Sequence, residues 1–356
     1  MADEKLPIEK FRVPPGQNYC LHCGLCLPVC RRLKEKGDRS LCKECLLCYS
    51  TCPRLHPPEI EASADGLVGS YRKIWQVKSV ERPKGAQDAG IVTLFIRHLL
   101  EDGEVDAALL IGRDREWRPE PVLVARREEA DKAAGTKFTV ATGLSGLKEG
   151  VSRFKRLTLV GLPCQLAALH NLYRKGKGYP QGGKVVFTIG LFCMTSFIYG
   201  APFPKGLKDV IEQEMGTSID RVDKIEITKG KLRVFPSGAT EPVVRGLKVL
   251  GDVTWPTCLG CGDYTALFAD LSVGSVGSEE NTNTVIVRTE AGSRVFDRLV
   301  NKGWVRAEEP GDLTELKRVA ELKKNRRDKL SPAEREFLGK GTVLGNWLNH
   351  LEQSSS

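Results

Sequence analysis

Eight cysteines in one short stretch constrain this chain more than any other feature of its sequence. The spacing C-x2-C-x2-C-x3-C occurs twice, first at Cys20, Cys23, Cys26 and Cys30 and then at Cys42, Cys45, Cys48 and Cys52. Three closely spaced thiolates bind one face of a 4Fe-4S cluster, and the fourth cysteine of each run binds the other cluster in two-cluster ferredoxins. The spacing therefore predicts two clusters, one held by Cys20, Cys23, Cys26 and Cys52 and the other by Cys42, Cys45, Cys48 and Cys30.

Zinc is the main alternative for these thiols, because zinc sites also contain C-x2-C pairs. Four tetrahedral ligands, however, give no reason for a doubled three-plus-one spacing. Disulfides are not expected either. The first residues, MADEKLPIEKFRVPPG, mix charges of both signs and contain no apolar core, so we expect no secretory signal and a reducing cytoplasm around the thiols.

The composition is that of an ordinary soluble protein. The 356 residues are 41% hydrophobic and 28% charged, which fits about two domains with a hydrophobic core. The net charge of +9 would attract an acidic partner, a phosphate-bearing ligand or an anionic surface. A basic zinc protein that binds nucleic acid is a competing hypothesis, but no recognition motif supports it, so we expect no nucleic-acid partner.

One stretch, residues 185–203, is uncharged and long enough to suggest a membrane span. Its β-branched first half, followed by glycines and a proline, instead predicts a buried strand and a turn. We therefore expect a cytoplasmic protein, attached at most peripherally to the cytoplasmic face of a membrane.

Hydrophobic patterns divide the chain into three parts. Residues 1–65 form a ferredoxin-like domain, 66–310 a larger domain, and 311–356 a charged helical tail that we interpret as solvated. Strands are predicted at 71–80, 105–112, 156–161 and 185–192, helices at 88–101 and 165–175, and a hairpin at 224–235 that turns at Lys229 and Gly230. Because strands alternate with helices before the hairpin, the predicted fold class is mixed α/β and α+β with a partly parallel sheet.

The four remaining cysteines stand in contexts that bring them together. Cys164 follows the predicted strand 156–161, and Cys193 follows the strand 185–192. In a parallel sheet both leave the same carboxyl edge, where such folds place their sites. Cys258 and Cys261 form a further C-x2-C pair, so the four thiols predict a third 4Fe-4S cluster. The alternative is that Cys164 and Cys193 are small buried hydrophobic residues.

Beyond its cysteines, the chain resembles the coenzyme F420 hydrogenase/dehydrogenase beta-subunit family over residues 71–292. The matching segments are GAQDAGIVTLFIRHLLEDGEVDAALL (85–110), GTKF (135–138), VGLPCQLAAL (160–169), IGLFC (189–193), KGK (229–231), CLGCGDYTALFADLSVGSVGS (258–278) and TNTVIVRT (282–289). The fused cysteine-rich module is similar to that of the electron-input subunit in the F420H2 dehydrogenase of archaeal respiratory complexes.

The resemblance implies a flavin, FAD rather than FMN, beside the third cluster, and coenzyme F420 as the substrate. A deazaflavin delivers two electrons as hydride whereas a cluster accepts one, so a flavin must connect them. We therefore expect an oxidoreductase that needs no protein group as a catalytic residue. It would oxidise reduced F420 and pass single electrons through three clusters to a partner subunit or complex, such as a complex I-like membrane complex.

The matching segments also supply candidate cofactor contacts. The expected flavin residues are Gln87, Asp88, Gly90, Thr93, Lys137, Thr284 and Arg288. The first four lie where a loop enters a helix, so backbone N–H groups there can meet phosphate or ring oxygens. Lys229 and Lys231, and also Lys137, suit the phosphate and acidic glutamyl tail of F420. For each residue singly, a local cap, a turn or a solvated lysine is the alternative.

Two other functions remain open. A flavoprotein of the same family could act on another substrate, as the related chlorophyll-pigment reductases do, or could run from ferredoxin toward F420. A chain without flavin could instead be a relay subunit that conducts electrons for a catalytic subunit.

Overall fold

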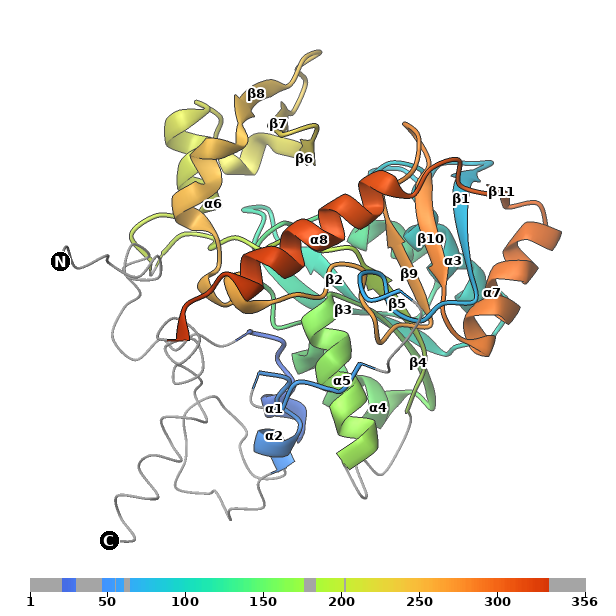
Figure 1. The fold of residues 1–356 in the computed structure, drawn as a ribbon. Coiled ribbons are helices and arrows are strands. Elements are labelled where there is room, and N and C mark those ends of the chain that lie inside the picture. Colours follow the sequence, from blue (N-terminus) through green and yellow to red (C-terminus); the bar gives the residue numbers. More distant parts are fainter. Residues whose placement is uncertain are drawn as a thin grey trace, which may run out of the picture.

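An eight-stranded mixed sheet forms the centre of the protein, with strand order β11-β1-β10-β9-β5-β4-β2-β3 (Figure 1). The computed structural model describes residues 21–29, 47–54, 56–60, 65–175, 184–201 and 203–332. The strands are β1 (Lys73–Ser79), β2 (Ala107–Arg113), β3 (Pro119–Val124), β4 (Arg156–Gly161), β5 (Lys184–Leu191), β9 (Leu271–Gly274), β10 (Asn283–Val287) and β11 (Val305–Glu308). The predicted mixed fold class with a partly parallel sheet is confirmed.

The middle of the sheet is parallel. β2 pairs with β4, β4 with β5 and β5 with β9 in parallel register. β10 pairs antiparallel with both β9 and β1, so β1 points in the same direction as β9. The carboxyl ends of β1, β9, β5, β4 and β2 therefore meet at one edge of the sheet, where parallel folds place their sites.

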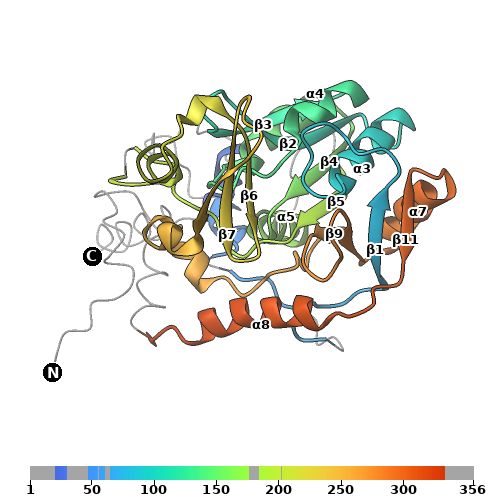
Figure 2. The same cartoon turned by 90° about the horizontal axis from the view of Figure 1, so that it is seen from above.

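Helices cover both faces of this sheet. One face carries α3 (Ile91–Glu101) and α7 (Glu290–Asn301), and the other carries α4 (Leu147–Arg153), α5 (Pro163–Lys175) and α8 (Thr314–Asp328) (Figures 1 and 2). Successive residues of a strand point to opposite faces, so Leu109 of β2 packs in the cluster with α5 while Leu110 packs in the cluster with α3. This double coverage explains why β10 is buried along its whole length.

Helix α3 begins three residues later than the predicted start at residue 88. Asp88 has a φ of 45° and Gly90 a φ of 70°, both in the left-handed region that does not continue a right-handed helix. A Cβ on Gly90 would lie 2.7 Å from the ring of Pro83, so the tight entry to α3 also needs the space that glycine leaves. From Ile91 onward, Leu94, Phe95 and Leu99 recur on one buried face, as in an amphipathic helix.

A second sheet forms a lobe beside the first (Figure 1). Its antiparallel strands are β6 (Val222–Thr228), β7 (Lys231–Pro236) and β8 (Val243–Gly246), and the short helix α6 (Leu207–Asp209) packs in the same lobe. The predicted hairpin with its turn at Lys229 and Gly230 is confirmed. Trp117, from the β2–β3 turn, joins the core of the lobe and donates its indole N–H to the Val222 carbonyl at 2.8 Å.

The cysteine-rich segment contributes two short helices, α1 (Cys26–Val29) and α2 (Leu47–Ser50). Leu25 and Val29 are buried in the hydrophobic cluster that also contains α5. The uncharged stretch 185–203 forms β5 and a following turn, as predicted. No helix within the described ranges is long and apolar enough to cross a membrane.

Helix α8 corrects the interpretation of the C-terminal region as solvated. The helix runs along one side of the molecule (Figure 2). Leu316, Ala320 and Lys323 lie on one face because they are four and three residues apart, and each is at most 2% exposed. Leu316 and Ala320 pack with Ile74 and Ile286 of the main sheet. The prediction for residues beyond 332 falls outside the described residues.

The packing of α8 predicts different costs for two leucines of the same helix. Leu316→Ala removes a side chain with 0% exposure and should lower the free energy of unfolding by about 2–5 kcal/mol. Leu322→Ala removes a side chain that is 50% exposed and should change the free energy of unfolding by less than about 0.5 kcal/mol. Urea unfolding followed by circular dichroism measures the stability of both variants. Equal midpoints for L316A and L322A would contradict the packing of α8 on the main sheet.

Candidate functional site

Four cysteines meet at the carboxyl edge of the main sheet. Cys164 lies in the first turn of α5 just after β4, and Cys193 follows β5. Cys258 lies in the short 3-10 helix Pro256–Gly260, and Cys261 follows it. All four line one small cavity, together with other residues that include Leu21, Trp255 and Lys323. The structure thus brings together four cysteines from three separate segments of the sequence, while their role as ligands stays a prediction.

The protein packed around the cavity changes the pKa of three of its thiols. Each thiol borders the cavity, yet burial in the surrounding protein raises the pKa of Cys164 and Cys258 and raises that of Cys193 to about 11. Among the described residues, no three His, Cys, Asp or Glu side chains are spaced to hold one metal ion.

A lysine is buried among the thiols. Lys323 of α8 lines the cavity, is 2% exposed and donates its ammonium to the Cys193 carbonyl. Burial alone would lower the pKa of Lys323, but the nearby Cys261, Cys193 and Asp263 groups outweigh burial and raise that pKa. Lys323 was not among the residues predicted from the sequence, although its helical spacing from Leu316 and Ala320 could have placed it on the buried face.

The loops that carry the cysteines are tied to α8 and to the sheet. Arg326 donates to the Met194 carbonyl at 2.9 Å and to the Cys258 carbonyl at 2.8 Å, so one guanidinium joins both loops. Gly190, near the end of β5, leaves the space into which Ala266 packs, because a Cβ there would clash with the Ala266 methyl group. The loop after Cys261 can therefore lie directly on the sheet.

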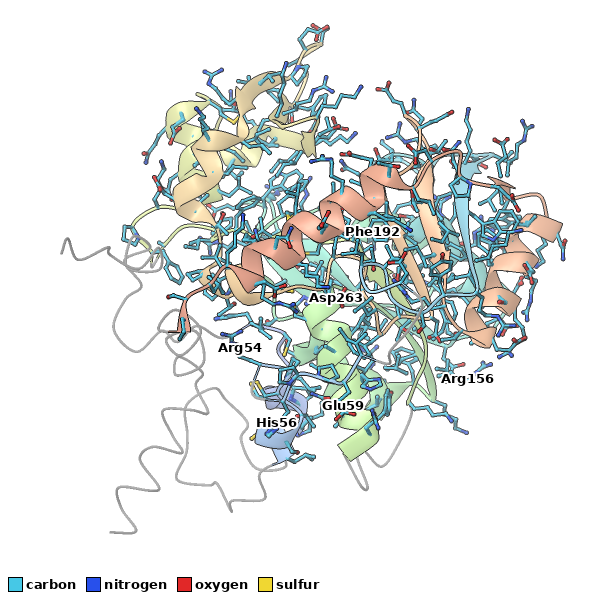
Figure 3. The ribbon with its side chains drawn as sticks, in the orientation of Figure 1. Arg54, His56, Glu59, Arg156, Phe192 and Asp263 are labelled. Carbon is cyan, nitrogen blue, oxygen red and sulfur yellow. The ribbon has the colours of Figure 1, made fainter. Side chains whose placement is uncertain are left out.

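The described part of the cysteine-rich segment packs against the same cavity. Leu21 lines the cavity, and the Cys23 carbonyl accepts a hydrogen bond from the Leu144 N–H at 2.9 Å. Arg54 lies between α1 and α2 and the C-terminal end of α8 (Figure 3). Burial lowers the pKa of Arg54, and the Cys52 and Cys261 thiols both oppose that shift, which places Arg54 close to a cysteine of each site.

Not all of the predicted ferredoxin-type ligands can be placed. Cys23 precedes α1, Cys26 lies in α1, Cys48 lies in α2, and Cys52 follows α2. The other four cysteines of the two motifs, Cys20, Cys30, Cys42 and Cys45, lie outside the described residues. The two ferredoxin-type clusters therefore stay predictions.

A second polar region follows β1 and β9 along the same sheet edge. Ser275, just after β9, donates its hydroxyl to the Asp88 carboxylate, so the two loops meet. The side-chain oxygen of Gln87 is buried without a hydrogen-bond partner among the described residues. No side chain in the described part of the chain caps α3, so the first backbone N–H groups of this helix can face an anion. Thr93, in the first turn of α3, is buried. These features fit a bound flavin phosphate or ring oxygen.

Lys137 lies beside this region. A Cβ on Gly135 would stand 3.0 Å from the Gly85 carbonyl, so the loop that carries Lys137 packs on the loop before α3. The Lys137 ammonium donates to the Ala134 carbonyl at 3.2 Å and to the Gly135 carbonyl at 2.8 Å. Burial, assisted by the charge of Arg113, lowers the pKa of Lys137 to about 7.

Most of this chain matches a known protein family. The family models for the coenzyme F420 hydrogenase/dehydrogenase beta subunit match residues 74–148 (N-terminal part) and 154–312 (C terminus). The beta subunit of the coenzyme F420 hydrogenase of Methanosarcina barkeri is 35% identical over 249 residues, which are 67% of this chain and 82% of that protein. The chain belongs to the coenzyme F420 hydrogenase/dehydrogenase beta-subunit family.

Other relatives place this family member among redox enzymes. One subunit of the F(420)H(2) dehydrogenase of Methanosarcina mazei is 30% identical over 321 residues, 86% of this chain and 90% of that protein. The coenzyme F420-dependent sulfite reductase of Methanocaldococcus jannaschii is 31% identical over 84% of this chain but only 48% of that protein. A chain in a solved structure of the F420-reducing [NiFe] hydrogenase complex from Methanosarcina barkeri superposes with a TM-score of 0.69 at 31% identity, covering 74% of this chain and 92% of that one.

Other predicted cofactor residues of this family member lie apart from the loop before α3. Thr284 is fully buried in β10 and donates to the Val276 carbonyl at 2.9 Å, which holds the loop after β9. Lys229 and Lys231 are exposed at the tip of the β6–β7 hairpin, where they could meet a ligand only from the solvent side.

Arg288 directs its guanidinium into the protein. Its N–H groups donate to five oxygen atoms, which belong to Ser272, Val68, Ser70 and Thr265. Burial lowers the pKa of Arg288 to about 10, against the opposing effect of Asp263. Arg288 thus fastens the segment before β1 to β9, and its contribution to flavin binding stays a prediction.

Arg288→Lys should therefore destabilise the protein even without cofactor. A lysine cannot make the five hydrogen bonds, and buried acceptors left without donors should cost about 3 kcal/mol or more in the free energy of unfolding. Arg294→Lys, on the exposed face of α7, is the matched control and should be neutral. Thermal unfolding of the flavin-free proteins tests this, and an unchanged midpoint for R288K would show that these hydrogen bonds do not support the fold.

Proposed function

We propose that this protein oxidises reduced coenzyme F420 by hydride transfer to a bound flavin and passes single electrons through three 4Fe-4S clusters to a partner subunit. The observation that carries this proposal is the meeting of four cysteines and an uncapped, glycine-containing helix entry at one edge of one sheet. Family membership supports F420 as the substrate, because relatives with about 30% identity are named for F420-dependent reactions.

Each cofactor has a set of residues that would hold it. Cys164, Cys193, Cys258 and Cys261 would hold one cluster. Gln87, Gly90 and the first turn of α3 would hold the flavin, which we propose to be FAD. A flavin at that position supplies the exchange between a two-electron hydride donor and one-electron carriers. The protein groups orient the cofactors, and none of them needs to act as a general acid or base.

The docking of the cysteine-rich segment supports an order for the electron carriers. Cys23 and Cys52 belong to the same predicted ferredoxin-type cluster, and both lie near the cavity of the four cysteines. Cys23 is also close enough to Cys164 to raise its pKa. We therefore place the cluster of Cys20, Cys23, Cys26 and Cys52 before the cluster of Cys42, Cys45, Cys48 and Cys30, from which a partner would receive electrons.

The excess of basic residues suits both partners of the proposed reaction. The net charge of +9 favours approach of the acidic coenzyme and of an acidic partner subunit or an anionic membrane surface. Lys229 and Lys231 stay candidates for the F420 tail because they are exposed on the hairpin. The terminal acceptor would be a subunit of a larger complex, as the names of the relatives suggest.

Anaerobic purification with iron, sulfide and flavin analysis, followed by addition of reduced F420, tests the proposal. About 12 irons per chain and one flavin are expected, with bleaching of flavin and cluster absorbance on addition of F420H2. A cluster-replete, flavin-loaded protein that does not bleach would remove F420 as the substrate. Full iron content without flavin after reconstitution would favour the relay-subunit alternative.

Single cysteine variants sharpen the test. Cys164→Ala should reduce the iron content by about four per chain, because it removes a ligand of one cluster only. Cys26→Ala should cause a similar loss from a different cluster, so the double variant should lose about eight irons. Equal iron content in wild type and C164A would show that the cavity thiols hold no cluster.

Flavin affinity should depend on pH through Lys137. The Lys137 ammonium has a pKa of about 7, so its positive charge is present below that pH and is lost as pH rises through it. FAD should therefore bind severalfold more weakly above pH 7 than below it, and Lys137→Met should remove this dependence. Lys132→Met, at an exposed position nearby, is the control and should keep it. Fluorescence titration measures the affinity, and the same pH profile in wild type and K137M would contradict a role for this charge.

A further inference from the structure

The ammonium group of Lys323 lies beside the predicted cluster ligands, although lysine does not bind iron in such clusters. Lysine is not a cluster ligand, yet this side chain lines the cavity of the four cysteines and is almost completely buried. It comes from α8, which lies outside both the cysteine motifs and the loop before α3. Its nearest described acceptor is the carbonyl of Cys193, the backbone of a predicted ligand.

A buried ammonium is costly unless negative charge or acceptors compensate it. The Cys193 carbonyl provides one acceptor. The buried carboxyl of Asp263, whose pKa is raised by burial, lies within electrostatic range of Lys323 but accepts a hydrogen bond from the Leu267 N–H at 3.0 Å. The remaining negative charge near Lys323 would come from the thiolates that hold a cluster.

We propose that Lys323 sets the reduction potential of the cluster held by Cys164, Cys193, Cys258 and Cys261, by holding a fixed positive charge beside it. This inference rests on the proposed function. Reduction adds one electron to the cluster, breaks and forms no bond and requires no proton. The added negative charge is attracted to the ammonium, and in a water-poor cavity this attraction is only weakly screened. Lys323 therefore favours the reduced state and raises the potential.

The same helix provides a matched control. Lys324 is the next residue, carries the same charge and is partly exposed, and it does not line the cavity. Lys324→Met changes the net charge by the same amount as Lys323→Met. Lys323→Arg keeps the charge in the cavity and tests whether charge, rather than side-chain shape, determines the potential.

The experiment is a redox titration of the full-length, cluster-reconstituted protein with dithionite, followed by electron paramagnetic resonance. The signal of the cavity cluster is the one that Cys164→Ala lacks. K323M should move the midpoint potential of this signal to more negative values, by at least the ~59 mV that corresponds to a tenfold change for one electron. K323R and K324M should stay near wild type, and the other two clusters should not shift in any variant.

Two results would overturn the proposal: a K323M protein with full iron content and an unchanged potential, or an equal shift in K323M and K323R. If K323M does not retain the cluster, Lys323→Gln, which can still donate to the Cys193 carbonyl, is titrated by the same criteria. A wild-type protein with only about eight irons would instead contradict the proposed function, because the cavity would then hold no cluster.

Discussion

The parallel pairing of β4 with β5, and of β5 with β9, determines where all other parts of the site lie. Parallel strands end at the same edge, so the chain must leave the sheet at neighbouring points after β4 and after β5. Cys164 and Cys193 occupy these two points. A glycine near the end of β5 then allows the loop after Cys261 to lie on the sheet. Four cysteines from three distant segments therefore meet because the strands are parallel and because Gly190 has no side chain.

Charge compensation is the second constraint on this edge. The cavity is lined by four thiols and by the buried Lys323, and the partly buried Asp263 and Arg54 lie close to these thiols. Buried charges are tolerated only when they are paired or hydrogen-bonded. Arg326 adds hydrogen bonds to the carbonyls of both cysteine loops, so α8 supplies mechanical support as well as charge. The helix is in this respect part of the site, although it follows the family domains in the sequence.

Much of this arrangement could be predicted from the sequence, for identifiable reasons. Strands such as β4 and β5 are short apolar segments followed by cysteines, so both the strands and the shared edge were accessible from pattern alone. The start of α3 could not be predicted from the sequence, because nothing in the sequence indicates that Asp88 adopts a positive φ. The inward direction of Arg288 depends on acceptors from segments distant in the sequence. The buried face of α8 gives only a weak apolar pattern, because Lys323 stands where an apolar residue would complete the stripe, and only its spacing from Leu316 and Ala320 indicates that face.

The position of Lys323 couples helix docking to cluster binding. Leu316 and Ala320 bury α8 against the sheet, and the same face then carries the ammonium into the cavity. Burial raises the pKa of Cys164 and Cys193, and so disfavours their thiolate forms. Under the proposed function, binding of the cluster supplies negative charge at that point. Binding and docking are linked reciprocally. If cluster binding stabilises the docked position of α8, docking of α8 must strengthen cluster binding by the same free energy. A weakened hydrophobic contact at Leu316 should therefore lower cluster retention from a distance, without any change in the ligands.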